Sequence, residues 1–293
     1  MLTIFSIPKP FEGHIGIIQR NAVASWRCLD SNYEIILYGD EKGTKEVASE
    51  FNAKYLPEVD RNKYGTPLLS SVFSQVRKTA INQLLCYVNT DIILMSDFKE
   101  AVKRAHFPNF LLVGQRWEVE MSELWNFENP SWEEKLRSYV DKFGNLGLPC
   151  GIDYFVFPRD NKIVELPPFA VGRPGWDNWF IYKTRSIGIP VIDITKVVTA
   201  IHQNHDHTHV LYGRNNTWEG PEAEINRKLM GRQEYTFSLL DATHILTSKS
   251  LKRACTNQHL RRYLQTIPIL FPRYEKIFSL FRAILRCLRP YRK

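Results

Sequence analysis

Apolar and polar positions along the first part of the chain predict strands separated by helices. Apolar runs over residues 1–8, 33–38 and 53–56 have the length of strands. Between them, apolar residues recur at helical spacing over residues 15–28 and 43–51. Because strands alternate with helices, we expect an α/β fold with a mainly parallel sheet that is flanked by helices.

A further helix is predicted after Tyr64, with apolar residues four positions apart at Val72, Val76, Ala80 and Leu84. It leads into residues 84–94, where Asn89-Thr90-Asp91 interrupts two apolar arms. One interpretation is a turn, because these residue types bond to their own backbone. The other is a strand that ends with Asp91 at the carboxyl edge of the sheet, where such sheets bind ligands. A carboxylate there can hold a divalent cation that neutralises a diphosphate.

The second half of the chain contains shorter apolar runs. Residues 111–114 and 151–157 are expected to be strands, the latter with Asp153 near its start, and residues 116–145 are expected to form loops and a helix. A Gly/Pro turn then brings Asp177 to the start of an apolar helix. Asp177 fits a helix N-cap, and a carboxylate in that position can also act as a base.

Four of the eight histidines lie close together, after an extended segment that ends at Ala200: His202, His205, His207 and His209. In an extended segment the last three share a face and His202 does not, so the four need not form one site. A zinc hydrolase is one alternative for this cluster. No HExxH sequence accompanies it, however.

Composition indicates a folded protein. The 293 residues are 44% hydrophobic and 24% charged, which is enough for one large domain or one domain with a tail. The five cysteines are scattered and include no CxxC pair, so neither a disulfide framework nor a cysteine zinc site is indicated. The short apolar start ends at Pro8 and is interpreted as a strand, not a signal peptide. A cytoplasmic protein is expected.

The positive charge belongs to the last part of the chain. From Lys249 onward there are twelve Lys/Arg residues and one acid, a net charge of +11, which leaves −3 for residues 1–248. After Tyr274, apolar and basic residues lie on opposite faces of a predicted helix, and no apolar run is long enough to span a bilayer. We expect a domain over residues 1–247 and a basic amphipathic helical tail over 248–293. The tail would lie on an anionic membrane surface or pack on the protein's own core.

These features resemble the GT-A type nucleotide-sugar glycosyltransferases. The resemblance rests on a Pro-rich loop after the first strand, a second strand that ends at Gly39-Asp40, and a strand that ends Tyr-Val-Asn-Thr-Asp. In that family the strand-end sequence is usually Asp-any-Asp and binds manganese or magnesium with the donor diphosphate. Here Asn89 replaces the first acid, and Asp91 matches the metal-binding position. The resemblance implies a GT-A, Rossmann-like fold with a nucleotide-binding half (1–98) and an acceptor and catalytic half (99–247).

The resemblance also implies roles for individual residues. Asp177 would be the catalytic base of an inverting enzyme, and His202 or His205 would complete a metal site with Asp91. Donor-binding roles would fall to Pro8, Asp40, Gly65, Arg77, Asn89, Asp91 and Asp153. From the residues themselves, Asp40 can also be a turn former, and the Gly65 segment and Arg77 can also be ordinary solvated surface.

The implied activity is transfer of a sugar from a nucleoside diphosphate to a hydroxyl of a glycan or lipid-linked acceptor, with Mn²⁺ or Mg²⁺ and in polysaccharide or glycan synthesis. No nucleic acid partner is expected, and the tail would hold the enzyme on the inner face of the cell membrane. The polar loop over residues 212–221 would fold over the donor or be plain surface. A sugar nucleotidyltransferase is an alternative, although residues 8–13 lack its Gly-rich phosphate loop. A non-catalytic sugar-binding protein is another.

Overall fold

The computed structural model describes residues 1–105, 107–205 and 218–274. Within these residues, nine strands form one sheet in the order β13-β12-β10-β6-β9-β4-β1-β2-β3. Their bounds are β1 (Leu2–Ser6), β2 (Glu34–Tyr38), β3 (Lys54–Leu56), β4 (Leu84–Val88), β6 (Leu111–Val113), β9 (Tyr154–Pro158), β10 (Val191–Asp193), β12 (His244–Leu246) and β13 (Leu251–Arg253). Neighbouring strands pair in parallel, except that β9 is antiparallel to β4 and β6, and β13 is antiparallel to β12. The expected α/β fold with a mainly parallel sheet is confirmed.

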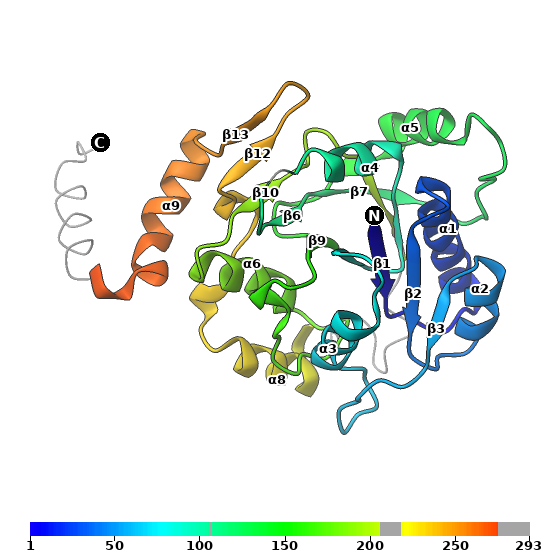
Figure 1. Cartoon of the computed structure of the whole chain (residues 1–293), viewed down its shortest axis with the longest axis horizontal. Helices are drawn as coiled ribbons and strands as arrows, with labels where there is room; N and C mark the ends of the chain where they lie inside the picture. Colours follow the sequence, from blue (N-terminus) through cyan, green and yellow to red (C-terminus); the bar gives the residue numbers. More distant parts are fainter. Residues whose placement is uncertain (106, 206–217, 275–293) are drawn as a thin grey trace.

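Helices cover both faces of this sheet (Figure 1). Helices α1 (Gly13–Leu29), α2 (Thr44–Glu50) and α4 (Ser96–Lys103) share one buried cluster, and α3 (Leu69–Thr79), α6 (Trp176–Ser186) and α8 (Pro221–Met230) contribute to the other. Ile4 of β1 points into the first cluster and the next residue, Phe5, into the second. Because side chains alternate and both faces are buried, apolar residues occur at consecutive positions of this strand.

A smaller sheet flanks the large one. In the described part of the chain it has the order β5-β11-β7-β8, with bounds β5 (Ile92–Ile93), β11 (Ala200–Asn204), β7 (Arg116–Glu120) and β8 (Asn145–Leu146). Helix α5 (Trp132–Phe143) packs on it. Strand β7 was not expected, since residues 116–145 were predicted to be loops and a helix. Residues 116–121 alternate polar and apolar, and Trp117, Val119 and Met121 pack in the cluster under α5, so the local strand pattern was present and was missed.

Two other boundaries differ from the sequence-based expectation. The helix predicted to include Ala80 and Leu84 ends at Thr79, and Leu84 opens β4. Between them, the backbone N–H of Ile81 donates to Glu34 Oε2 and the amide of Asn82 donates to Thr3 Oγ1. These two bonds hold the segment against β1 and β2, so the four-residue spacing does not continue the helix.

The globular part also extends past the expected boundary at residue 247. Strand β13 pairs with β12, and α9 (Asn257–Leu270) follows it; Figure 1 shows α9 beside these strands. Arg262 of α9 donates from Nε to both carboxylate oxygens of the buried Asp241, each at 2.9 Å. Helix α9 is therefore attached to the sheet domain.

Short 3₁₀ helices complete the described elements: η1 (Lys162–Val164), η2 (Gln233–Tyr235), η3 (Leu239–Asp241) and η4 (Pro272–Tyr274). None of the described helices is both long and apolar enough to cross a bilayer. Some predicted features lie outside the described residues: His207, His209, most of the polar loop over 212–221, and the amphipathic helix after Tyr274.

Candidate active site

The parallel strands bring several predicted donor-binding residues to one edge of the large sheet. Pro8 follows the carboxyl end of β1, Asp40 that of β2 and Asn89 that of β4. Because β9 runs antiparallel to β4, Asp153, just before β9, lies at the same edge. Helix α6 leads into the parallel strand β10 and so begins at this edge too, with Asp177 in its first turn. This is the edge at which open α/β sheets bind ligands.

The polar triplet after β4 is both a strand end and a turn. The N–H of Ile92 donates to Asn89 O at 3.1 Å and closes the turn before β5. The hydroxyl of Ser6, at the end of β1, donates to Val88 O at 2.6 Å and lies 2.8 Å from Thr90 Oγ1. The two interpretations of the sequence are therefore compatible, because the turn itself presents Asp91 at the sheet edge.

Asp91 lies against two histidines that are distant in sequence. His205 Nε2 is 3.2 Å from Asp91 Oδ2, and His202 Nε2 is 3.7 Å from the same oxygen. One ligand atom from each of the three residues lies within 4.8 Å of the others, so we call Asp91, His202 and His205 the triad. Strand β11 ends at Asn204, so the alternation of strand faces does not continue to His205. His202 and His205 therefore share a site with Asp91, which the sequence left open.

The charge state of Asp91 suits a metal ligand. Burial alone would raise its pKa, but the histidines and Lys9 outweigh burial and hold the pKa below the usual range. The carboxylate is therefore ionised at neutral pH. Asp91 Oδ1 is buried and has no hydrogen-bond partner in the described part of the chain. A buried unpaired carboxylate oxygen is costly, and two imidazoles beside it complete a donor set for a divalent cation.

Buried amides fix the position of the triad. Gln203, fully buried between the two histidines, donates to Ile18 O of α1 at 2.7 Å and to Asp91 O at 3.2 Å. Its own carbonyl oxygen accepts from Asn21 Nδ2 at 2.9 Å. One side chain thus connects α1, β11 and the turn that carries Asp91.

A second group of charges surrounds Asp153. Asn89 Nδ2 donates to Asp153 Oδ1 at 2.7 Å, and Arg116 forms an ion pair with Asp153 Oδ2. Arg116 also reaches Glu118 Oε1 at 3.2 Å, while its Nε is buried without a partner among the described residues. Arg116 was not identified from the sequence, since residues 116–145 were interpreted as loops and a helix. Asn89, in contrast, has a positioning contact that explains why an amide can replace an acid there.

Asp177 lies in the first turn of α6 and is not its N-cap. The N-cap is Gly175, with φ of 103°, a conformation that glycine adopts readily. Burial, together with the nearby Asp153, raises the pKa of Asp177 to about 6, although backbone N–H groups and Arg116 act in the opposite direction. Because Gly175 is the N-cap of α6, the interpretation of Asp177 as the N-cap is wrong. A carboxyl group with this pKa is still largely ionised at pH 7 and is more basic than an ordinary aspartate.

Tyr87 of β4 shows how close these acids are. Its ring contacts Trp176 edge-on, with 5.2 Å between ring centroids. Burial raises the pKa of its hydroxyl, and Asp91, Asp153 and Asp177 raise it further. The three carboxylates therefore act on one buried tyrosine, and they come from the turn after β4, the residue before β9 and the first turn of α6.

Arg61 connects two other predicted donor-binding residues. Its guanidinium pairs with Asp40 and donates to Gly65 O at 2.8 Å, and it also pairs with Glu41 at 3.0 Å. Asp40 and Arg61 line a surface hollow beside β2. A polar hollow at the carboxyl end of β2 is suited to a ribose or a base, and Arg61, like Arg116, was not identified from the sequence.

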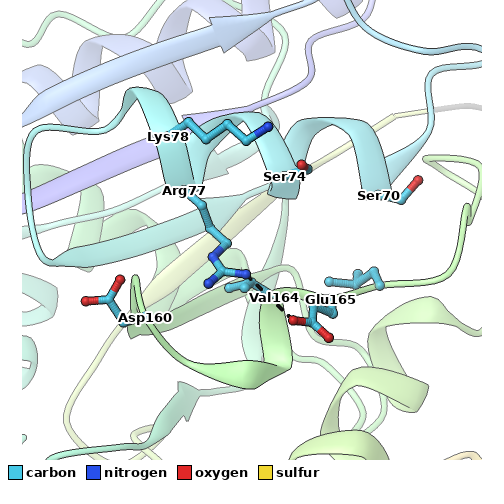
Figure 2. A pocket seen from close by; sticks show the side chains of 8 residues that line it. Ser70, Ser74, Arg77, Lys78, Asp160, Val164 and Glu165 are labelled. Atoms are coloured by element: carbon cyan, nitrogen blue, oxygen red, sulfur yellow. Dashed lines mark ion pairs between the residues drawn. The ribbon is translucent and has the colours of Figure 1, made fainter.

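Arg77 is the predicted donor-binding residue that the structure separates from the others. Helix α3 leads into β4, so its last turn with Arg77 lies at the sheet edge opposite Asp91. Figure 2 shows Arg77 and Lys78 beside an open pocket on the protein surface, with Glu165 facing Arg77 at 3.8 Å. We therefore leave Arg77 out of the candidate site, and place the site at the triad instead of in this pocket.

Two further cations lie near the triad. Lys9 directly follows Pro8, and its pKa responds to both Asp91 and Arg173. Arg173 donates to Glu222 Oε2 from Nε at 3.1 Å and from Nη2 at 2.6 Å. Neither residue was identified from the sequence, because Asp91 and Glu222, the acids that act on them, lie far along the chain.

No protein-family model and no curated protein sequence matches this chain. Solved structures do. Glucosyl-3-phosphoglycerate synthase from Mycobacterium tuberculosis, in complex with phosphoglyceric acid, is 12% identical; the match covers 78% of each chain, with a TM-score of 0.47. S. aureus TarS 1-349 is 11% identical over 69% of this chain and 60% of its own, with a TM-score of 0.46. Mannosyltransferase PcManGT from Pyrobaculum calidifontis, in complex with GDP-Man and Mn²⁺, is 13% identical over 69% of this chain and 56% of its own, with a TM-score of 0.41.

These identities and TM-scores are too low to assign an activity or a residue role to this chain.

Proposed function

We propose that this protein is an inverting glycosyltransferase that moves a sugar from a nucleoside diphosphate to an acceptor hydroxyl. The observation that carries the proposal is the buried Asp91 Oδ1, which has no hydrogen-bond partner among the described residues and faces a site shared with two histidines. A cation-binding triad at the carboxyl edge of the sheet is the arrangement that a diphosphate leaving group requires. Asp177, at the same edge of the sheet, supplies the base.

The triad residues Asp91, His202 and His205 would hold the cation. When bound, a divalent cation stabilises the negative charge that develops on the leaving diphosphate. Two imidazoles and one carboxylate favour Mn²⁺ over Mg²⁺, because imidazole binds transition metals well whereas Mg²⁺ prefers oxygen ligands.

Asp177 performs the proton transfer. As the acceptor oxygen attacks the anomeric carbon, the bond from that carbon to the phosphate oxygen breaks and the diphosphate leaves with the electron pair. The acceptor proton passes to the Asp177 carboxylate. Its pKa of about 6 keeps it ionised at pH 7 and makes it a better proton acceptor than an unperturbed aspartate. One displacement of this kind inverts the configuration of the sugar.

Asp153 and Arg116 position the reacting groups. Arg116 reduces the repulsion between Asp153 and Asp177, since its charge acts on both carboxylates. Asn89 holds the other oxygen of Asp153. Donor residues further along the edge are Pro8, Asp40 and Gly65, of which the last two share Arg61.

The acceptor class and the membrane role extend this proposal. The acceptor is a hydroxyl of a glycan or lipid-linked saccharide, in polysaccharide or glycan synthesis. The basic tail brings the enzyme to an anionic membrane surface, as the charge pattern of residues 275–293 in the sequence indicates. That part of the tail lies outside the described residues.

A thermal-shift panel of UDP-, GDP-, CMP- and dTDP-sugars, with and without Mn²⁺, tests the donor class directly. We expect one nucleoside diphosphate sugar to raise the melting temperature only when Mn²⁺ is present, and Asp91→Asn to abolish the shift. His244→Gln, which changes a histidine of β12 outside the triad, is the matched control and should keep the shift. If no nucleotide sugar stabilises the wild-type chain under any of these conditions, the proposal is wrong.

Hydrolysis of the donor is the second candidate activity, because an aspartate with two histidines is also a donor set for a hydrolytic metal. A product-release assay with the donor that the panel identifies separates the two. A hydrolase releases free sugar and nucleoside diphosphate without an acceptor at the full rate, whereas a transferase releases them slowly until an acceptor is added.

A further inference from the structure

We propose that Lys9 is a second anion-binding group of the site, which contacts the donor diphosphate together with the triad-bound cation and makes the site selective for diphosphates over monophosphates. This inference rests on the proposed function. It assigns a role to a residue that neither the sequence motifs nor the triad identifies.

The backbone of Lys9 is held rigidly by a buried side chain. The N–H of Lys9 donates to Gln19 Oε1 at 2.7 Å, and Gln19 Nε2 donates back to Lys9 O at 2.9 Å. Gln19 also reaches Pro10 O at 3.4 Å and is only 2% exposed. These hydrogen bonds restrict the backbone of Lys9 before a ligand binds. Less conformational entropy is therefore lost on binding, which favours a ligand-binding role over a purely solvated one.

Lys9 and Asp91 lie on neighbouring strand ends. Strands β1 and β4 are adjacent and parallel, and Ser6 of β1 contacts Thr90, the residue before Asp91. Lys9 comes three residues after Ser6. Burial lowers the pKa of Lys9, Asp91 raises it and Arg173 lowers it further, so the ammonium group is within electrostatic reach of both side chains.

The charges on the two cations are balanced differently. Arg173 forms an ion pair with Glu222, which also accepts from Asn62 Nδ2 at 2.7 Å. Within residues 1–105, 107–205 and 218–274, the Lys9 ammonium forms neither an ion pair nor a hydrogen bond, and Asp91 is the acid that acts on it. Arg173 is therefore satisfied by the protein, and Lys9 is not.

A bound metal would leave the charge of Lys9 still less balanced. A divalent cation at the triad would neutralise the negative charge of Asp91, which would then no longer offset the positive charge of Lys9. Two positive charges on the cation and one on Lys9 then face one carboxylate, with neutral histidines as the other ligands. The esterified diphosphate of a nucleotide sugar brings two negative charges, one on each phosphate, and can contact the cation and Lys9 at once. A monophosphate ester carries a similar total charge at neutral pH, but on a single phosphate, so it cannot place one phosphate on the cation and a second on Lys9.

A calorimetric titration of the full chain in saturating Mn²⁺ tests the inference, with UDP against UMP and GDP against GMP as ligands. Lys9→Gln should weaken diphosphate binding by about 10- to 100-fold, the loss expected for one charge-assisted hydrogen bond, and monophosphate binding by less than about threefold. Lys9→Arg, which keeps the charge, should recover most of the affinity. Lys42→Gln is the matched control, since Lys42 is an exposed lysine of the neighbouring surface whose ion pair is with Glu12.

The outcomes separate this inference from the proposed function. If wild-type protein binds the diphosphate and Lys9→Gln binds it equally well, or loses both ligands to the same extent, the role of Lys9 is refuted and the glycosyltransferase proposal stands. If the wild type binds none of the four nucleotides and no nucleotide sugar of the thermal-shift panel stabilises it, both are refuted. Should Lys9→Gln melt well below the wild type, the Lys9→Arg titration decides, because a lysine that only supports folding has no reason to discriminate diphosphate from monophosphate.

Discussion

Asn89 donates to Asp153 twice, from Nδ2 to Oδ1 at 2.7 Å and from its backbone N–H to the backbone oxygen at 2.9 Å. The side-chain bond requires a donor at position 89. Both carboxylate oxygens of Asp153 act as acceptors, Oδ1 for the amide of Asn89 and Oδ2 for Arg116. An acid at position 89 would face a carboxylate with no proton to donate at neutral pH. The departure from the usual Asp-any-Asp sequence is therefore matched by a contact inside the site.

We predict that Asn89→Asp destabilises the protein by about 2–4 kcal/mol at pH 7, because it replaces a hydrogen bond to a charged group by repulsion between two carboxylates. Asn89→Ala, which removes the donor and adds no charge, should cost less. Denaturant unfolding of both variants at pH 7 and pH 5 measures this. The penalty of Asn89→Asp should shrink at the lower pH, where the pair takes up a proton; a pH-independent penalty would contradict the proposed contact.

Asp177→Asn should lower the transfer rate by about 100- to 10,000-fold while donor affinity stays within about twofold, as expected for loss of a positioned base. The wild-type kcat/KM should fall as the pH drops below about 6, since the base must be ionised and its pKa is raised to about 6. The residual activity of Asp177→Asn should lack this acid limb. Rate measurements from pH 5 to 8 at saturating Mn²⁺ check both points, and a wild-type rate in the variant would remove Asp177 from the mechanism.

The raised pKa of Asp177 also predicts a stability effect. The folded state binds this proton more tightly than the unfolded state, whose pKa is near 3.8, so the protein loses stability as the pH rises from about 4 to about 6. Asp177→Asn should therefore be more stable than the wild type at pH 7, on the order of 1–2 kcal/mol, with a smaller difference at pH 4. Thermal melts at the two pH values measure this. A variant that is less stable at pH 7 would indicate a structural role for the carboxylate.

Substitution of a triad residue should weaken metal binding without unfolding the protein. We expect Asp91→Ala to abolish Mn²⁺ binding, and His202→Ala or His205→Ala to weaken it by at least about tenfold. Mn²⁺ titration followed by electron paramagnetic resonance reports this without any substrate. Full transfer activity in excess chelator would disprove metal dependence and leave the fold unaffected.

Truncation of the tail tests membrane binding, and the structure indicates at which residue the truncated chain should end. A chain that ends near Gln265 would remove Thr266 and Ile267, which are buried, and would expose the core. A chain that ends at Tyr274 keeps α9 and its Arg262–Asp241 pair. We expect the full chain, but not this truncated chain, to co-sediment with anionic liposomes. Equal co-sedimentation of the two would place membrane binding elsewhere.

The sheet was accessible from the sequence because its strands are local apolar runs with helices between them. Asp91 was accessible for the same reason, since a carboxylate that interrupts two apolar arms is conspicuous. Arg116, Lys9 and Gln203 were not identified, because their importance comes from partners distant in sequence: Asp153, Asp91 and α1. Arg77 differs in the opposite way. It lies on the polar face of α3, as the sequence indicates, but its end of α3 is at the sheet edge opposite Asp91.

The pairing of β5 with β11 has a consequence for how the site can be lost. Ile92 and Ile93 follow directly after Asp91, and their partners are His202 and Ile201. Two residue pairs join β5 to β11, whereas β1 pairs with β2 and with β4 over four residues each and β4 pairs with β9 over five. Detachment of β11 would therefore abolish cation binding while the large sheet stays folded. Added Mn²⁺ should accordingly slow hydrogen exchange in residues 200–204 more than in β1 or β4, because the cation would join His202 of this segment to Asp91.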